Sequence, residues 1–186
     1  MKRTTHPILL VLIALVAAGC NKSIIRPIED LRVYAGVNTG DQRLYTSETD
    51  TITLVINDVS GSIDEKRYCT YLRTTGVAHG FPNGETMTVY ADYTFRDVKG
   101  KGAFFDYCLD ASLTMCMDNG KLFHNNYIEY RYNMPEHFAI LSEDGEKVIA
   151  IHQSNVGYTT LVDPAGRSWN YIGNTENTPA NTRQRK

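Results

Sequence analysis

The sequence predicts an all-β domain of antiparallel strands, and three features carry this prediction. Apolar and polar residues alternate with a period of two in many short segments, as they do in strands with one buried face. Clusters of Gly, Asn, Asp and Pro separate these segments. The chain also contains twelve Tyr, six Phe and one Trp, residue types that strands favour. Many short strands at regular spacing indicate an antiparallel sheet stack, arranged as a sandwich, a barrel or a propeller-like fold.

The alternation locates the individual strands. Ile52, Leu54 and Ile56, for example, share one face of the segment 51–57. The same pattern predicts strands at residues 32–37, 43–47, 66–73, 86–95, 111–117, 128–132, 137–142, 147–152, 158–162 and 168–172. Only the short segment 59–65 has a composition that would suit a helix.

Turn sequences connect the predicted strands. Asn83-Gly84, Asn119-Gly120 and Asp144-Gly145 are typical of hairpin turns, because Gly adopts a positive φ at no steric cost. Pro164-Ala165-Gly166 is a further turn of this kind. We therefore expect neighbouring strands to be joined as hairpins.

Composition and charge exclude several classes of protein. The 186 residues are 42% hydrophobic and 22% charged, with a formal net charge of -2. No collagen-like or coiled-coil period is visible, and the apolar content is too high for a wholly disordered chain. Without a basic excess the chain lacks the charge that binds phosphates, so we expect no nucleic-acid partner.

The first 20 residues have the pattern of a processing signal. Lys2 and Arg3 form a positive start, and an uncharged apolar run follows at residues 8–18. The sequence Leu-Val-Ala-Ala-Gly-Cys at residues 15–20 resembles the lipobox of bacterial lipoproteins. That resemblance implies cleavage after residue 19 and lipidation of Cys20. The alternative is an ordinary secretory peptide in which Cys20 is coincidental.

The predicted domain organisation follows from this signal. We expect a signal peptide at residues 1–19, a lipidated tether at 20–30, one β domain at 31–173 and a disordered tail at 174–186, which has almost no apolar side chain. Asn21 follows Cys20 where some lipoproteins carry Asp. By the sorting rule of enteric lipoproteins, this resembles an address on the periplasmic face of the outer membrane.

Three cysteines remain in the predicted domain. Because the cell envelope is oxidising, we expect one disulfide and one remaining thiol. Cys108 and Cys116 are eight residues apart and would be too distant if they share an extended strand. The preferred pairing is therefore Cys69 with Cys108, although a pairing of Cys108 with Cys116 stays open. No CxxC motif or nearby His is present, so we expect no metal site.

The chemistry-bearing residues form no catalytic pattern. The mature chain has four His residues, and none belongs to an HxH or HxxxH pair. There is no GxSxG elbow and no Gly-rich phosphate loop. We therefore expect a protein that is not an enzyme and that carries no cofactor.

One short motif is more specific. The segment 116–123, Cys-Met-Asp-Asn-Gly-Lys-Leu-Phe, resembles the Asp-box, a structural motif that caps a β-hairpin. In this motif Asp118 is expected to accept backbone N–H groups within the turn, Gly120 to supply a positive φ, and Phe123 to pack under the hairpin. A degenerate second copy is expected at 163–169, with Asp163 one residue too early.

The combination of a lipobox, a β domain and this hairpin resembles a family of immunity lipoproteins. The residues that carry the resemblance are 32–46, with Val-Tyr and Arg-Leu-Tyr-Thr, and 108–123, with a weaker match at 138–151. The family (the Tli-like group) accompanies type VI secretion phospholipase effectors. Cys116 stands where the Asp-box motif has a hydroxyl residue, and the chain is short.

The resemblance implies a membrane-anchored protein that binds a lipase-type toxic effector and blocks its active cleft. Such a protein needs a rigid surface with aromatic anchors rather than catalytic residues. Tyr90, Tyr127 and Tyr132 are candidate anchors. Two alternatives stay open: a structural or assembly lipoprotein of the envelope or of a secretion machine, and a ligand-binding or carbohydrate-active module.

Overall fold

The structure is a computed structural model that describes residues 25–98, 106–120, 122–124, 128–131 and 134–175. The predicted signal peptide, the lipidation residue Cys20 and all but the first two residues of the predicted tail lie outside these ranges. In the described part the all-β, antiparallel fold class is confirmed: eleven strands form one sheet, accompanied by one short helix.

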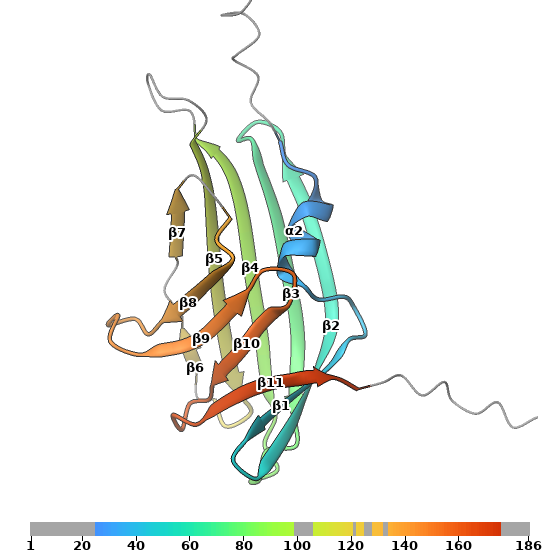
Figure 1. The fold of residues 1–186 in the computed structure, drawn as a ribbon, viewed down its shortest axis with the longest axis vertical. Helices are drawn as coiled ribbons and strands as arrows, with labels where there is room; N and C mark the ends of the chain where they lie inside the picture. The colour runs from blue at the N-terminus through green and yellow to red at the C-terminus, as the bar shows by residue number, and fades with distance from the viewer. Residues whose placement is uncertain (1–24, 99–105, 121, 125–127, 132–133, 176–186) are drawn as a thin grey trace, which may run out of the picture.

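The sheet is curled into a nearly closed barrel (Figure 1). Its spatial order is β6-β5-β4-β3-β2-β1-β11-β10-β9-β8, with β7 paired to β5 beside this path. The first and last strands are neighbours, and this contact brings the two halves of the meander together. The strands are β1 (Gln42–Ser47), β2 (Asp50–Asp64), β3 (Cys69–His79), β4 (Met87–Val98), β5 (Asp106–Met117), β6 (Leu122–His124), β7 (Ile128–Arg131), β8 (His137–Leu141), β9 (Val148–Gln153), β10 (Gly157–Val162) and β11 (Ser168–Asn174).

The period-two pattern of the sequence gives the barrel an apolar interior. Leu72, Tyr93 and Ala111 lie opposite one another on β3, β4 and β5, and all three are buried. The residues beside them, Arg73 and Asp92, pair on the outer face of the same strands. This alternation fixes the register, because a shift of one residue would turn every apolar side chain outwards.

One short helix was not expected from the sequence. Residues 32–37 do not form the predicted strand, because α2 (Ile28–Ala35) contains all but the last two of them. Leu31, Tyr34 and Ala35 are buried, and their spacing of three and four residues is that of one helix face. Pro27 is compatible with this helix because it precedes the first helical residue. The segment 59–65, which suited a helix, instead continues strand β2 to Asp64.

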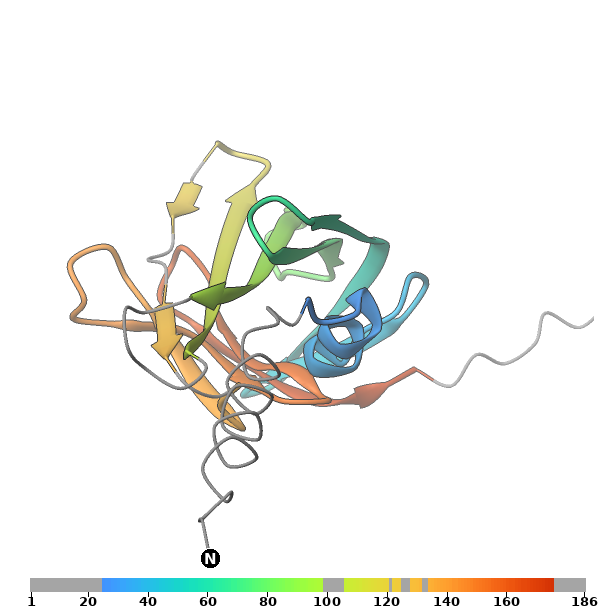
Figure 2. The same ribbon diagram turned by 90° about the horizontal axis from the view of Figure 1, so that it is seen from above.

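The helix lies between the two sides of the curled sheet (Figure 2). At its start, a Cβ on Gly61 of β2 would lie 2.4 Å from Cγ2 of Ile28. At its end, Gly36 adopts a left-handed φ of 65°, and a Cβ there would lie 2.5 Å from the backbone of Asn155 and Val156. The two glycines therefore let the helix contact both β2 and the turn between β9 and β10.

The structure contradicts the predicted disulfide between Cys69 and Cys108. Arg96 of β4 lies directly opposite both cysteines, so a whole strand separates them. Strands are about 4.8 Å apart, which places the two Cα atoms roughly 10 Å apart and beyond the reach of a disulfide. Cys116 shares strand β5 with Cys108 and is also too far along it. Among the described cysteines there is no disulfide.

Candidate binding site at the loop end of the barrel

Three connections meet at one end of the barrel: the β3–β4 loop, the β5–β6 turn and the β10–β11 turn (Figure 1). Between them lies a cavity of about 290 Å³, here called the loop-end cleft. Its lining residues are Phe81, Pro82, Asn83, Glu85, Met117, Asn119, Asp163, Pro164, Ala165, Arg167 and Trp169.

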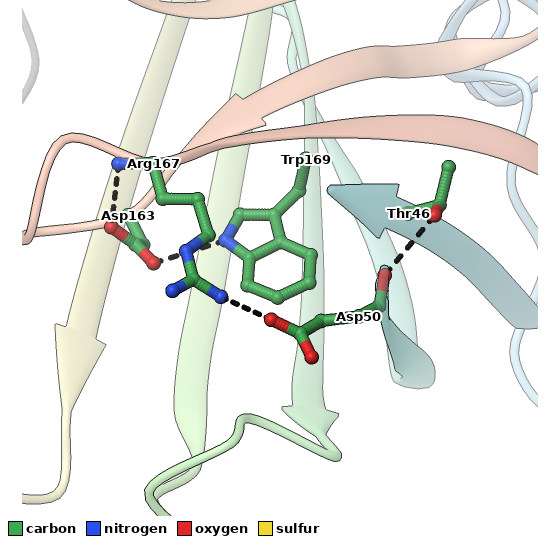
Figure 3. Close-up of polar contacts among 5 residues, drawn as sticks. All are labelled: Thr46, Asp50, Asp163, Arg167 and Trp169. Atoms are coloured by element: carbon green, nitrogen blue, oxygen red, sulfur yellow. Dashed lines mark hydrogen bonds and ion pairs between the residues drawn. The ribbon is translucent and has the colours of Figure 1, made fainter. Parts of the chain in front are cut away.

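Asp163 and Trp169 form the floor of the cleft (Figure 3). The Asp163 carboxylate accepts the Trp169 indole N–H at 3.0 Å and the backbone N–H groups of Ala165 and Arg167 at 2.9 and 3.0 Å. Trp169 is fully buried, and its ring meets Phe81 edge-on at 5.3 Å between centroids. A carboxylate with three donors and a packed indole together hold the β10–β11 turn in one conformation.

Arg167 extends this floor towards the β1–β2 hairpin (Figure 3). Its Nη1 atom lies 2.6 Å from Oδ2 of Asp50, and its guanidinium lies 5.4 Å from the centroid of the Trp169 ring. Thr46 donates its hydroxyl to the backbone carbonyl of Asp50 at 3.1 Å, which fixes the hairpin that carries this carboxylate. The pair is partly exposed, so its contribution to stability is small, but it restrains the side chain at the cleft.

The opposite wall is organised around Glu85. The side-chain amides of Asn83 and Asn119 donate to its two carboxylate oxygens at 2.5 and 2.7 Å. Asn83 also accepts the backbone N–H of Glu85 at 3.1 Å. Because both donors are neutral, the negative charge of Glu85 is positioned without being cancelled.

The Asp-box residues have partly different roles from those expected. Asp118 accepts the backbone N–H and the hydroxyl of Thr86 at 3.1 and 2.6 Å, so it ties the β5–β6 turn to the residue before β4. Among the described residues of its own turn, which exclude residue 121, no backbone N–H donates to it. Gly120 has the predicted positive φ, at 79°. The Phe123 side chain lies outside the described part of the structure. The degenerate copy at Asp163 is the one that caps its own turn.

The charges around the cleft are predominantly negative. Glu85 and Asp163 line it, and Asp50 and Asp118 lie beside it, whereas Arg167 is the only cation among the described lining residues. Pro82, Pro164 and the rings of the floor supply apolar surface. A cleft of this composition can accept an aliphatic side chain that ends in a cation. Within the described residues, no cluster of three or more His, Cys, Asp or Glu could hold a metal ion.

The interior of the barrel is filled by side chains. His152 is fully buried between the rings of Tyr34 and Phe138, with ring centroids 5.1 and 4.6 Å away. Neither of its ring nitrogens has a hydrogen-bond partner. Burial, with a smaller effect from the positive charge of Arg43, lowers the pKa of His152 to about 3. The imidazole is therefore neutral and inaccessible, which does not suit a catalytic base.

Arg43 is the buried cation of the interior. Its guanidinium donates to the backbone carbonyls of Gly36 and Tyr158 at 3.3 Å each and lies 4.1 Å from the centroid of the Tyr171 ring. It also donates to the Tyr45 hydroxyl at 3.2 Å, while burial raises the pKa of that phenol. A cavity of about 20 Å³ beside these groups has room for a water molecule but not for a larger ligand.

A second concavity lies on the outer face of β2, β3 and β4. It measures about 500 Å³ and is bordered by Ser60, Ser62 and Tyr71. Across it, the Arg73 guanidinium donates to both carboxylate oxygens of Asp92 at 2.6 and 3.0 Å, and this partner raises the pKa of Arg73. Because these opposite charges neutralise each other, this concavity attracts a charged ligand less strongly than the loop-end cleft does.

Comparison with known proteins identifies no relative: no family model, no curated protein and no solved structure matches the chain. In the described residues, no helix is both long and apolar enough to span a membrane.

The sequence predicted part of this site and missed the rest. The degenerate motif predicted at 163–169 contains Asp163 at its start and Trp169 at its end. Glu85 was not predicted, because its amide partner Asn119 lies 34 residues away. Arg167 and Asp50 are 117 residues apart, and no local pattern connects them. Of the candidate aromatic anchors, Tyr90 is exposed on β4, whereas Tyr127 and Tyr132 lie outside the described residues.

Proposed function

We propose that the protein is a lipid-anchored binding protein of the bacterial cell envelope that docks and blocks a toxic effector protein at its loop-end cleft. The observation that carries this proposal is the cleft itself, whose floor and wall are held by the Asp163–Trp169 and Glu85–Asn119 hydrogen bonds. A rigid cleft limits the conformational entropy that binding costs. An inhibitor of this kind needs no catalytic group.

The position of the cleft supports this role. At the other end of the barrel, the Thr70 hydroxyl donates to the carbonyl of Arg26 at 2.5 Å, which places the start of the described chain beside the start of β3. The strand runs from there towards the cleft over eleven residues, roughly 33 Å for ten steps at 3.3 Å each. If Cys20 carries a lipid anchor, the cleft faces away from the membrane and is open to a partner.

The charge of the cleft defines the chemistry of the partner. We propose that the effector inserts a Lys or Arg side chain whose stem packs against Pro82 and Pro164 and whose cation meets Glu85. Fixing one such anchor in a desolvated cleft is the usual basis of a binding hot spot. The cleft supports only a binding role; the toxic nature of the partner and its lipase-type activity rest on the family resemblance alone.

The proposal is tested by capture with a matched pair of variants. The mature chain, its Ala165→Arg variant in the cleft and its Val33→Arg variant on the exposed face of α2 are used to capture proteins from envelopes of the source bacterium and its competitors. The expected partner binds the mature chain and V33R but not A165R, and is toxic in the periplasm unless the wild-type chain is present. A toxic partner that binds all three forms equally would contradict binding at the loop-end cleft. A partner that is a non-toxic component of the envelope would instead support a structural lipoprotein.

A further inference from the structure

The turn between β2 and β3 exposes two large apolar side chains. Ile63 and Tyr68 are each 44% exposed, and they flank the polar turn residues 64–67. We call residues 63–68 the hairpin tip. A pair of exposed apolar residues at the end of a hairpin, with charged residues between them, has the amphipathic character of a membrane-contacting loop.

The backbone at Tyr68 reinforces this reading. Its φ is 53°, in the left-handed region that bulky side chains seldom adopt. Residues in this region cost free energy, and they are concentrated where function requires a particular side-chain direction. Here the conformation leaves the phenol ring at the end of the molecule, partly exposed to solvent.

The charges of the tip are balanced within it. The Asp64 carboxylate accepts the backbone N–H groups of Lys66 and Arg67 at 3.0 and 3.1 Å, and lies 3.7 Å from the Arg67 guanidinium. Glu65 and Lys66 complete the turn. Because the four charges sum to zero, electrostatic repulsion from an anionic surface is small, and the long side chains can extend to the headgroups.

The tip lies at the end of the barrel where the described chain begins and α2 starts (Figure 1). Thr70, two residues beyond Tyr68, donates its hydroxyl to the backbone carbonyl of Arg26. Five residue steps separate Cys20 from Ile25, so the covalent reach between them is at most about 18 Å. A lipid on Cys20 would therefore hold this end of the domain close to the membrane surface.

We infer that the hairpin tip docks into the headgroup region of the membrane that anchors the chain, with Tyr68 and Ile63 as its contacts. The occupant of this surface is the lipid bilayer, and the inference rests on the lipidation of Cys20 in the proposed function. Tyr is typical of membrane interfaces, where its ring is apolar and its hydroxyl is hydrated. This contact would orient the barrel with its loop-end cleft away from the bilayer.

The test measures depth in the bilayer with tryptophan reporters. The full chain is produced with its own signal, purified with its acyl group and placed in vesicles of phosphatidylethanolamine and phosphatidylglycerol that carry brominated acyl chains near the headgroup. Tyr68→Trp and Ile63→Trp report the tip, and Asn83→Trp reports the far end. The native Trp169 is fully buried. The parent chain, which has no added reporter, therefore gives the background fluorescence and its quenching. Mass spectrometry of the N-terminus verifies the acyl group.

If the tip docks, the bromine atoms should quench the tryptophan fluorescence of Y68W and I63W severalfold more strongly than that of N83W. The emission of Y68W and I63W should also shift to the blue. Equal and weak quenching at all three positions in acylated protein would overturn the docking while leaving the anchor and the partner-binding proposal intact. A chain without an acyl group at Cys20 would overturn both the docking and the anchored form of the proposed function. Far-ultraviolet circular dichroism verifies that each reporter variant is folded.

Discussion

Trp169 donates its indole N–H to the carboxylate of Asp163 at 3.0 Å, and both side chains are buried beneath the loop-end cleft. The same carboxylate accepts two backbone N–H groups of the β10–β11 turn. One side chain therefore determines the position of a turn, of the only tryptophan in the chain and of one side of the cleft.

Asp163→Ala is expected to destabilise the protein by about 2 to 4 kcal/mol, because it leaves the buried indole N–H and two part-buried backbone N–H groups without their acceptor. The free energy of unfolding in urea measures this effect. Asp144→Ala is the matched control, since Asp144 also caps a Gly-containing turn but is fully exposed, and its effect should be much smaller. An equal loss of unfolding free energy in the two variants would mean that the hydrogen bonds of Asp163 do not stabilise this end of the barrel.

His152 is expected to make the fold sensitive to acid. Its pKa is about 3 in the folded chain and 6.5 in its ordinary state, so the unfolded chain binds more protons between these values. The stability associated with His152 is therefore complete above pH 6.5 and is lost as the pH falls towards 3, by up to about 4 to 5 kcal/mol. Urea unfolding across this pH range measures the loss.

His152→Phe should flatten that pH dependence, because the ring nitrogens have no hydrogen bonds to lose and the neighbours are aromatic. His137→Phe serves as the control, since His137 is exposed at the start of β8. If the free energy of unfolding still falls with pH in H152F, or no longer falls in H137F, the acid sensitivity belongs to a group other than His152.

Gly36→Ala is expected to loosen the helix from the barrel. The substitution places a Cβ 2.5 Å from the backbone of Asn155 and Val156 in addition to the cost of a left-handed alanine, together about 3 kcal/mol. Gly40→Ala also has a positive φ, at 91°, but its Cβ meets no atom within 4 Å, so it should cost only about 1 kcal/mol. Thermal unfolding of both variants compares them, and a similar loss in each would argue against tight helix docking.

No disulfide is expected to join Cys69 to Cys108, even under oxidising conditions, because Arg96 separates them in the sheet. The free energy of unfolding should therefore be the same with and without reductant. Alkylation of the denatured, non-reduced protein followed by mass spectrometry should label Cys69 and Cys108 separately. A cross-linked peptide pair that contains both residues would show that the register of β3, β4 and β5 is different.

Strands with persistent alternation were predictable from the sequence. The segment 86–95 became β4 almost at its predicted bounds, because its apolar residues repeat with period two and all face the interior. The helix was missed because Val33 and Val37 favoured a strand, although Leu31, Tyr34 and Ala35 have helical spacing. Its formation depends on burial of that face between distant parts of the sheet, including the turn at Asn155.

The site was less predictable than the fold. The capping role of Asp163 follows from local turn chemistry, and for this reason a sequence motif detects it. The pairings of Glu85 with Asn119 and of Arg167 with Asp50 depend on the order of strands in the barrel. The disulfide prediction failed for the same reason, since cysteine spacing contains no information about the strand that lies between Cys69 and Cys108.

The most direct test of the central claim is the dissociation constant of the captured partner for three forms of the mature chain: wild type, Glu85→Gln and Val33→Arg. The E85Q variant keeps the size of the side chain, removes its charge and replaces one of the two oxygens that accept from Asn83 and Asn119 with a donor. The account predicts that it weakens binding about tenfold or more, as loss of a desolvated charge contact does. It predicts that V33R binds like the wild type. Unchanged affinity in E85Q, or a loss in V33R instead, would contradict binding at the loop-end cleft.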